Sequence, residues 1–134
     1  MSLDRERAMA FVDGYGQTWD SWDIAGFVAL FSDDVVYIDH QTDERVVGGE
    51  ALAGYLRKEE AEQGAVSVRM GKPIVDGDRV VAEFWVTRTN GDEVATLAGC
   101  FIAQLDQADG RCKHFREYWF ETEGHASPYE GWGE

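Results

Sequence analysis

The stretch "RVVAEFWVTRTNGDEVATLAGCFIAQLDQADGRCKHFREYWFE", residues 79–121, decides the fold. It holds three long runs rich in β-branched and aromatic residues, separated by the turn sequences "NGDE" and "QADG". Runs of this kind joined by short turns are typical of antiparallel strands. A further strand is predicted over residues 65–75, where Pro73 indicates an edge or a bulge, and the hairpin turn "DGD" follows it. We therefore predict a four-stranded antiparallel meander.

The first half of the chain is mainly helical. Apolar residues recur there at steps of three and four, which is the spacing of one helix face. Asp23 can cap the second helix, and Gly64 lies where the third helix would end. Helices followed by a meander are typical of an α+β fold with the helices packed on one face of the sheet. The predicted elements are helices over residues 4–22, 24–31 and 48–64, a strand over 35–39, and a turn or short strand over 42–49.

Length and charge limit the class of protein. The chain has 134 residues, which fits one domain over residues 1–134, and 44% of them are hydrophobic. Its net charge of −14 opposes binding to nucleic acid or to an anionic membrane, since both favour a basic surface. There is no apolar signal segment, no apolar run near the roughly 18 residues of a membrane span, and no metal-binding spacing of Cys100 and Cys112. We expect a cytoplasmic protein with two free thiols, a disulfide being the alternative.

The end of the chain has no periodic pattern. Residues 121–134 contain glycine, proline and the aromatic residues Tyr129 and Trp132. We expect this tail to dock on the domain or on a partner subunit.

Four segments carry a family resemblance. They are "TWDSWDIAGFVALFSDDVVYID", "VVGGEALAGYL", "IVDGDRVVAEFWV" and "DGRCKHFREYWFE", in this order along nearly the whole chain. Together they resemble the nuclear transport factor 2-like superfamily, and within it the SnoaL-like polyketide cyclase and ketosteroid isomerase branch. The resemblance implies a curved antiparallel sheet wrapped as a cone around a long N-terminal helix, a pocket at the open end, and a homodimer through the outer sheet face. Because this fold hosts many activities and some proteins with none, it predicts a pocket more firmly than a reaction.

Asp39 is the first candidate for chemistry. Strand alternation places it on the same face as Tyr37. The resemblance gives Asp39 the position of a general base and Tyr15 that of a hydrogen-bond donor to a developing enolate. His40 could act as an acid or base if the turn curls it back, and would otherwise point to the opposite side. A structural Asp39 and a core Tyr15 are the alternatives, and "LAGCFIAQ" lacks the second acid that steroid isomerisation needs.

The pocket walls are expected to be aromatic and acidic. By resemblance, the faces carrying Glu83 with Trp85, and Phe115 with Glu117 and Trp119, look into the cone. Structural roles for Glu83 and Glu117, held by hydrogen bonds, are the alternative. The full set of expected substrate-binding residues is Trp19, Tyr37, Tyr55, Glu83, Trp85, Phe115, Glu117 and Trp119.

The leading hypothesis is a protein that binds a small, mostly apolar or aromatic molecule, with no cofactor and no metal. It would be an acid–base enzyme of the isomerase, cyclase or dehydratase (lyase) type. A non-catalytic ligand-binding or dimerisation module is the first alternative. The second is epoxide hydrolase-like activation of water by paired acids and an arginine. Whether the chain is an enzyme stays open at this point.

Overall fold

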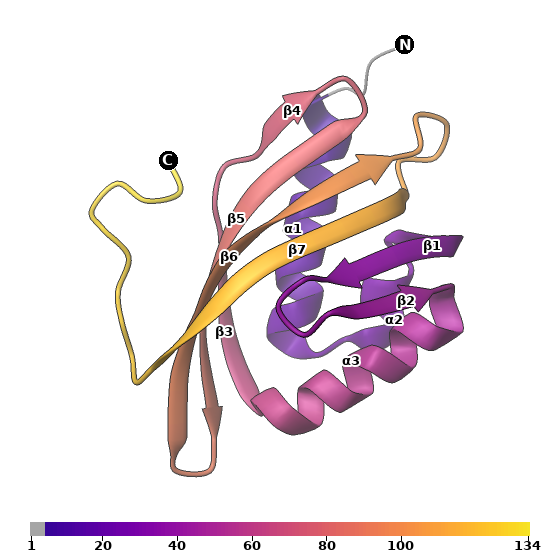
Figure 1. Ribbon diagram of the computed structural model, residues 1–134. Helices are drawn as coiled ribbons and strands as arrows, with labels where there is room; N and C mark the ends of the chain where they lie inside the picture. The colour runs from indigo at the N-terminus through magenta and orange to yellow at the C-terminus, as the bar shows by residue number, and fades with distance from the viewer. Residues whose placement is uncertain (1–4) are drawn as a thin grey trace.

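The computed structural model describes residues 5–134 as three helices and one seven-stranded sheet (Figure 1). The strand order is β2-β1-β7-β6-β5-β3, and β4 pairs with β5 beside this path. The sheet is strongly curved, with α1 along its concave side and α3 beside β1 and β2 (Figure 1). The predicted α+β fold is therefore confirmed. The helices are α1 (Arg5–Ser21), α2 (Ile24–Val28) and α3 (Gly49–Gln63), and the strands are β1 (Phe31–Asp39), β2 (Glu44–Val47), β3 (Ala65–Met70), β4 (Ile74–Asp76), β5 (Arg79–Asn90), β6 (Glu93–Leu105) and β7 (Cys112–Glu123).

The meander follows the prediction except at its first strand. Strands β5, β6 and β7 pair in antiparallel register through the predicted turns. Gly77, in the turn between β4 and β5, and Gly91, in the turn between β5 and β6, adopt φ of +61° and +63°, a region that L side chains rarely enter. The strand predicted over 65–75 is instead two strands, β3 and β4, because the chain leaves the ladder at the segment that contains Pro73, which has no N–H to donate.

The start of β1 differs from the prediction. The second helix ends at Val28 and β1 already begins at Phe31, so residues 32–34 lie in a strand and do not end a helix. Phe31 pairs with Cys112 of β7, and the register shifts before the next pair, Val36 with His114. This irregularity hides the alternation that would reveal the strand in the sequence. The β1–β7 pair is also parallel, in a sheet otherwise paired antiparallel.

The core forms between α1 and the concave face of the sheet. Phe11 meets Phe31 and Phe101 edge to face, at ring-centroid distances of 5.7 and 5.8 Å. Gly16 lets α1 approach the sheet closely, because a Cβ there would lie 2.6 Å from Met70 Cγ. The close approach explains why a residue of low helix propensity occupies the middle of α1.

The tail lies on the convex, outer face of the sheet. Trp132 is buried there against Trp85, at a centroid distance of 6.0 Å, and under the guanidinium of Arg69. The indole N–H of Trp85 donates to the carbonyl of Ala126 at 2.9 Å. The expectation that Glu83 and Trp85 look into the cone is therefore wrong: Glu83 is exposed and Trp85 packs under the tail.

Two further sequence expectations concern the cysteines and the membrane. Cys100 and Cys112 are free thiols, and burial raises the pKa of Cys112 to about 12. None of the helices in the described part of the chain is long and apolar enough to cross a membrane.

Candidate functional site

Two buried carboxyl groups lie side by side at the open end of the cone. Asp39 ends β1 and Glu117 lies in β7, and the two are direct partners in the parallel β1–β7 ladder. Direct partners project to the same side of a sheet, here toward α1 and α3. Their side chains are almost fully shielded, with 1% and 5% of their surface exposed. A buried carboxyl group must be hydrogen-bonded, paired with a cation or protonated.

Asp39 is held by four hydrogen bonds. One carboxylate oxygen accepts from the backbone N–H of Gln41 at 3.0 Å and of Thr42 at 3.4 Å, and from the indole N–H of Trp119 at 2.9 Å. The other accepts from the hydroxyl of Tyr55 at 2.6 Å. The first oxygen is therefore fully occupied, whereas the second keeps one acceptor position beside the Tyr55 hydroxyl. Asp39 thus fixes the turn after β1 and positions Trp119 and Tyr55.

Glu117 has a different environment. Three tyrosine hydroxyls surround its carboxyl group: Tyr37 at 3.0 Å, Tyr55 at 3.2 Å and Tyr15 at 3.3 Å. Burial, followed by the charge of Asp39, raises the pKa of Glu117 to about 8, although the Tyr37 and Tyr55 hydrogen bonds oppose this. At neutral pH Glu117 is therefore mainly a carboxylic acid.

The hydrogens in this cluster can be counted. The pKa of the Tyr55 phenol is raised by burial and by Glu117, so Tyr55 keeps its single proton. That proton belongs in the short contact with Asp39. The same hydroxyl lies 3.2 Å from Glu117 Oε1, a longer contact through which it can donate to the ionised form of Glu117. The Tyr55 hydroxyl thereby links the carboxyl groups of Asp39 and Glu117.

A third acid, on α3, was not among the predicted site residues. Glu59 is buried, burial raises its pKa, and it accepts a hydrogen bond from the Gln63 amide at 3.0 Å. The same amide group accepts from the indole N–H of Trp19 at 3.0 Å through its oxygen. The signal in the sequence was the helical spacing, since Glu59 follows Tyr55 and Leu56 on the buried face of α3.

Two small cavities open between these groups. One has a volume of about 30 Å³ and the other about 20 Å³, so each is large enough for a water molecule or two. Asp39 and Trp119 line the smaller cavity, whereas Tyr15, Trp22 and Tyr37 line the larger. Both cavities are lined by Trp19, Tyr55, Glu59, Gln63 and Glu117.

Trp22 was also not predicted as a site residue. Its backbone φ is +51°, which is uncommon for a residue with a side chain. Its indole N–H donates to the carbonyl of Gly64 at 2.8 Å, which ties the end of α1 to the end of α3. Trp22 is thereby fixed as a wall of the larger cavity.

The structure brings most of the predicted residues together, but not all. Phe115 lies beneath the site as core, stacked on Tyr37 at a centroid distance of 4.6 Å. His40 is exposed and stacks on Tyr118 at 4.6 Å on the outer face, so the turn does not curl it back into the cone. Tyr15 donates to Glu117 and not to Asp39. The predicted residues that line the cavities are Tyr15, Trp19, Tyr37, Asp39, Tyr55, Glu117 and Trp119.

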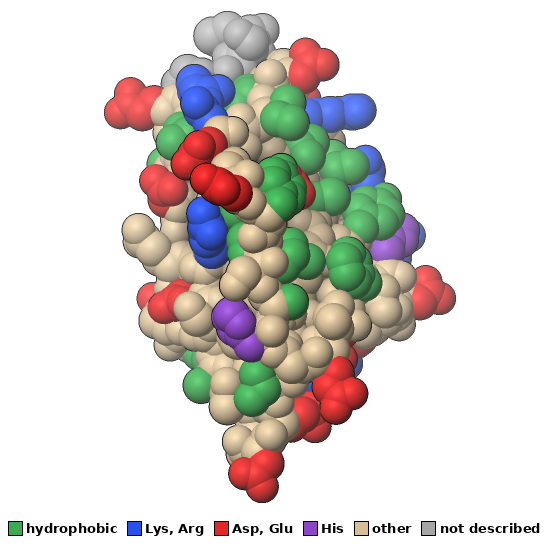
Figure 2. All heavy atoms as spheres, turned by 90° about the vertical axis from the view of Figure 1, so that its left-hand side faces the viewer, with side chains coloured by type: hydrophobic (Ala, Val, Ile, Leu, Met, Phe, Trp, Pro, Cys, Tyr) green, Lys and Arg blue, Asp and Glu red, His purple; other side chains and the backbone are tan. Residues whose placement is uncertain are grey.

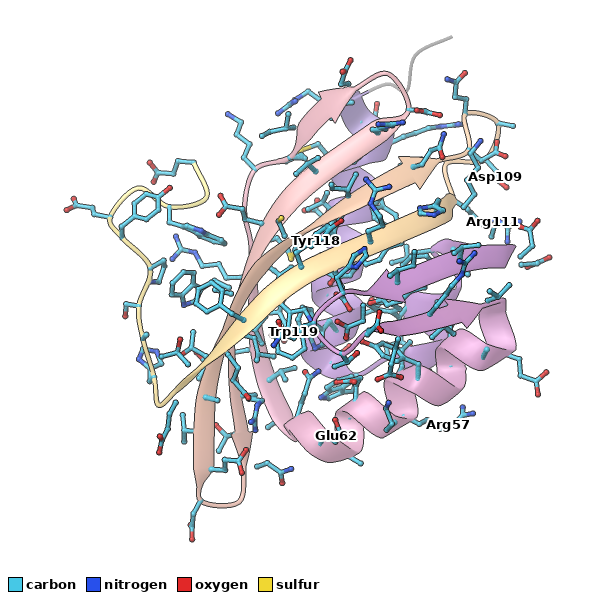
Figure 3. The ribbon with its side chains drawn as sticks, in the orientation of Figure 1. Arg57, Glu62, Asp109, Arg111, Tyr118 and Trp119 are labelled. Carbon is cyan, nitrogen blue, oxygen red and sulfur yellow. The ribbon has the colours of Figure 1, made fainter. Side chains whose placement is uncertain are left out.

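Among the described residues, no positively charged side chain lies beside the acids in the lining of the cavities. The lining of the two cavities contains no lysine, arginine or histidine within the described residues. Arg57 on α3 and Arg111 near the start of β7 lie away from Trp119 and the site (Figure 3), and Arg111 pairs with Asp109 and Asp33. Residues 5–134 also contain no group of three His, Cys, Asp or Glu side chains arranged to hold a metal ion.

Known proteins share this fold. Residues 12–115 match the family described as SnoaL-like domain. An LEH-like epoxide hydrolase from Mycobacterium tuberculosis is 25% identical, with a TM-score of 0.70 over 86% of this chain and 84% of that one. A protein from Kribbella flavida, provisionally assigned as a ketosteroid isomerase, is 26% identical, with a TM-score of 0.69 over 96% and 88% of the two chains.

A third neighbour is more distant. It is a hypothetical protein with a ketosteroid isomerase-like fold from Catenulispora acidiphila, solved in complex with trimethylamine. It is 19% identical, with a TM-score of 0.70 over 81% of this chain and 83% of that one, which shows a shared fold alone. None of the curated proteins is significantly similar in sequence.

Proposed function

Because the chain belongs to the SnoaL-like domain family, we propose that it binds a small, mostly apolar molecule in the cone and that Glu117 exchanges a proton with it. One observation carries the proposal: Glu117 is buried, lines both cavities and is surrounded by three tyrosine hydroxyls. A general acid or base works best when its pKa lies near the working pH, and the pKa of Glu117 is about 8. Isomerisation, cyclisation and dehydration all use such a group without a cofactor.

The neighbours of Glu117 have supporting roles in this proposal. When Glu117 gives up its proton, the hydroxyls of Tyr15 and Tyr37 donate to the carboxylate that forms and stabilise it. Asp39 is a positioning residue, because its hydrogen bonds hold Tyr55 and Trp119 in place. The base that the resemblance assigns to Asp39 is thus transferred, in this proposal, to the residue beside it in the sheet.

Two observations bear on the alternatives. The small volumes of the cavities favour a binding module without turnover as the second candidate. Epoxide hydrolysis is the activity named for the Mycobacterium tuberculosis neighbour. Paired acids with an arginine would be needed for it here, yet none of the described arginines lines either cavity.

The five tryptophans provide a direct test of binding. Trp19, Trp22 and Trp119 line the cavities, whereas Trp85 and Trp132 pack together on the outer face. The indole ¹⁵N–¹H signals, assigned by single Trp→Phe changes, should be followed during titration with small neutral ring compounds such as cyclohexanol and phenol. We expect shifts in the first three signals and none in the last two. Shifts confined to the outer pair, or no shifts, would contradict the binding site.

Catalysis needs a separate test on a compound that binds and is turned over. The Glu117→Gln variant should lose activity by about 10²-fold or more while still binding the compound. Glu83→Gln, which makes the same change on the outer face, is the matched control and should stay fully active. Full activity of Glu117→Gln would exclude Glu117 as the acid. If compounds bind but none is turned over, the result would favour the second candidate, a binding module without turnover.

A homodimer through the outer sheet face is a further part of the proposal. Tyr118 and Phe120 leave 42% and 60% of their surface exposed there, and Figure 2 shows hydrophobic side chains gathered on the face that carries the tail. Light scattering should give a mass near twice the 15.0 kDa of the chain, and Phe120→Asp should return it to that of a monomer. A wild-type mass of one chain would contradict the dimer.

A further inference from the structure

The charged side chains that line the two cavities are all acidic among the described residues. Glu59 and Glu117 line both cavities, and Asp23 and Asp39 each line one of them. No lysine, arginine or histidine in the described residues lines either cavity. An anionic ligand would be repelled by those of these acids that are ionised, and a neutral ligand would not change their charge state. A positive ligand would compensate their negative charge.

Aromatic rings form the rest of the walls. In the larger cavity, Tyr15 meets Trp19 at a centroid distance of 5.7 Å and an interplanar angle of 72°, and Phe27 at 5.4 Å and 46°. Tyr37 and Tyr55 meet at 5.4 Å and 51°. Tyr15, Trp19, Phe27, Tyr37 and Tyr55 all line the larger cavity. The faces of aromatic rings attract cations, and cages of such rings recognise quaternary ammonium groups.

The free space limits the size of the ligand. A volume of about 30 Å³ has room for one or two heavy atoms, so even a ligand of five heavy atoms requires a small movement of the wall residues and a larger one requires more. Trp22 is tied to Gly64 and Trp19 to Gln63 by hydrogen bonds, so the walls resist such movement. The pocket therefore suits a compact group better than a fused ring system.

We propose that the ligand of this pocket is a small organic cation of the alkylammonium type, held between the aromatic rings and the carboxyl groups of Glu59 and Glu117. This inference rests on the proposed function, because it names the ligand class of the same pocket. The apolar character of the ligand is kept, since the alkyl groups contact the rings while the charge faces the acids. Lys58 lies 5.7 Å from the Tyr55 ring but is directed to Glu44 outside the cavities, so it does not take this place.

Binding of a cation should release a proton. The titratable groups that face Glu117 are Asp39 and Tyr37 from β1, Tyr55 and Glu59 from α3, and Tyr15 from α1. None of them is positive, so a bound cation would be the first positive charge beside Glu117 and would lower its pKa. The affinity for a cation should therefore rise with pH until Glu117 is ionised in the free protein, at a pH of about 8.

The test compares two probes of the same number of heavy atoms. Tetramethylammonium chloride and tert-butanol should be titrated against the tryptophan indole signals, with sodium chloride added to match ionic strength. We expect tetramethylammonium to shift the Trp19 and Trp22 signals and to bind about tenfold more tightly than tert-butanol. Its affinity should increase severalfold between pH 6.5 and 8.5, whereas that of tert-butanol should not change.

Variants on α3 provide the matched control. Glu59→Gln should weaken tetramethylammonium binding severalfold, whereas Glu60→Gln, its exposed neighbour, should not. Equal affinity for the two probes, or an unchanged tetramethylammonium affinity in Glu59→Gln, would contradict the proposal that the ligand is a cation. Neither result would contradict the proposed pocket. If neither probe shifts Trp19, Trp22 or Trp119, both the cation and the pocket are refuted.

Discussion

The two faces of β7 carry similar residue types, but one face is directed into the cone and the other is directed outward. Phe115, Glu117 and Trp119 point into the cone, and Glu117 is only 5% exposed. Tyr118 and Phe120, on the same strand, point to the outer face and are 42% and 60% exposed. Period-two alternation separates the two sets, but it does not say which set faces the core.

Strand β5 shows what determines which face of a strand is buried in the core. It also carries an acid and a tryptophan on one face, Glu83 and Trp85, yet that face lies outside under the tail. The opposite face of β5 carries the wholly apolar Phe84 and Val86, which are buried. Burying apolar area dominates the choice, so an acid lies inside only where the other face of its strand is no more apolar.

The largest expected effect separates two phenylalanines of β7. Phe115→Ala should lower the free energy of unfolding by about 4 kcal/mol, because it leaves a cavity in a fully buried place. Phe120→Ala should change it by less than about 0.5 kcal/mol in a monomeric sample. Urea denaturation measures both. Similar losses for the two variants would break the assignment of inner and outer faces.

The second prediction concerns the anchoring role of Asp39. Asp39→Ala leaves the Tyr55 hydroxyl, the Trp119 indole and two backbone N–H groups without their acceptor, so stability should fall by about 3 kcal/mol. Asp34→Ala, an exposed change on the same strand, is the control and should be nearly neutral. A neutral Asp39→Ala in urea denaturation would show that these hydrogen bonds do not hold the site.

The third prediction is a pH dependence due to Glu117. Its pKa is about 8 in the folded chain and about 4.5 in the unfolded chain, so between these values the folded state holds a proton that the unfolded state has lost. Stability should therefore fall as pH rises from about 5 to 8, with a slope approaching 1.4 kcal/mol per pH unit, roughly the value for one proton, and then level off. Urea denaturation across this range should show the slope in wild type, and Glu117→Gln should remove it. A slope that persists in Glu117→Gln belongs to another group.

The smallest effect compares two tyrosine hydroxyls. Tyr55→Phe removes the group that links Asp39 to Glu117 and should cost about 1 kcal/mol or slightly more. Tyr118→Phe removes a hydroxyl on the outer face and should be neutral within about 0.5 kcal/mol. Thermal unfolding followed by circular dichroism would measure the pair. A larger loss of stability in Tyr118→Phe than in Tyr55→Phe would contradict the stabilising role of the Tyr55 hydroxyl.

Much of the fold could be predicted from the sequence because local signals determine it. The turns around Gly77 and Gly91 fix the register of the hairpins, and the apolar face of residues 4–22 marks α1. The start of β1 could not be predicted in this way, because the register shift after Phe31 breaks the alternation. The parallel β1–β7 pair is a long-range contact with no local signal.

The site could be predicted only in part, for the same reason. Alternation grouped Asp39 with Tyr37 and Glu117 with Trp119, and the resemblance turned both sets inward. It could not show that Asp39 is held by four donors or that Glu117 lies among three hydroxyls, because these contacts join α1, β1, α3 and β7. The wholly apolar face of β5 did contain the information that would have placed Glu83 and Trp85 outside.

The central claim is that Glu117, and not Asp39, is the proton-carrying group of the pocket. The ¹³C carboxyl signals of glutamate-labelled protein should be followed between pH 5 and 9.5, with the Glu117 signal assigned by its absence in Glu117→Gln. We expect this signal to titrate with a pKa near 8, well above the ordinary value of about 4.5 for a glutamate. A Glu117 signal already ionised at pH 5 would contradict it.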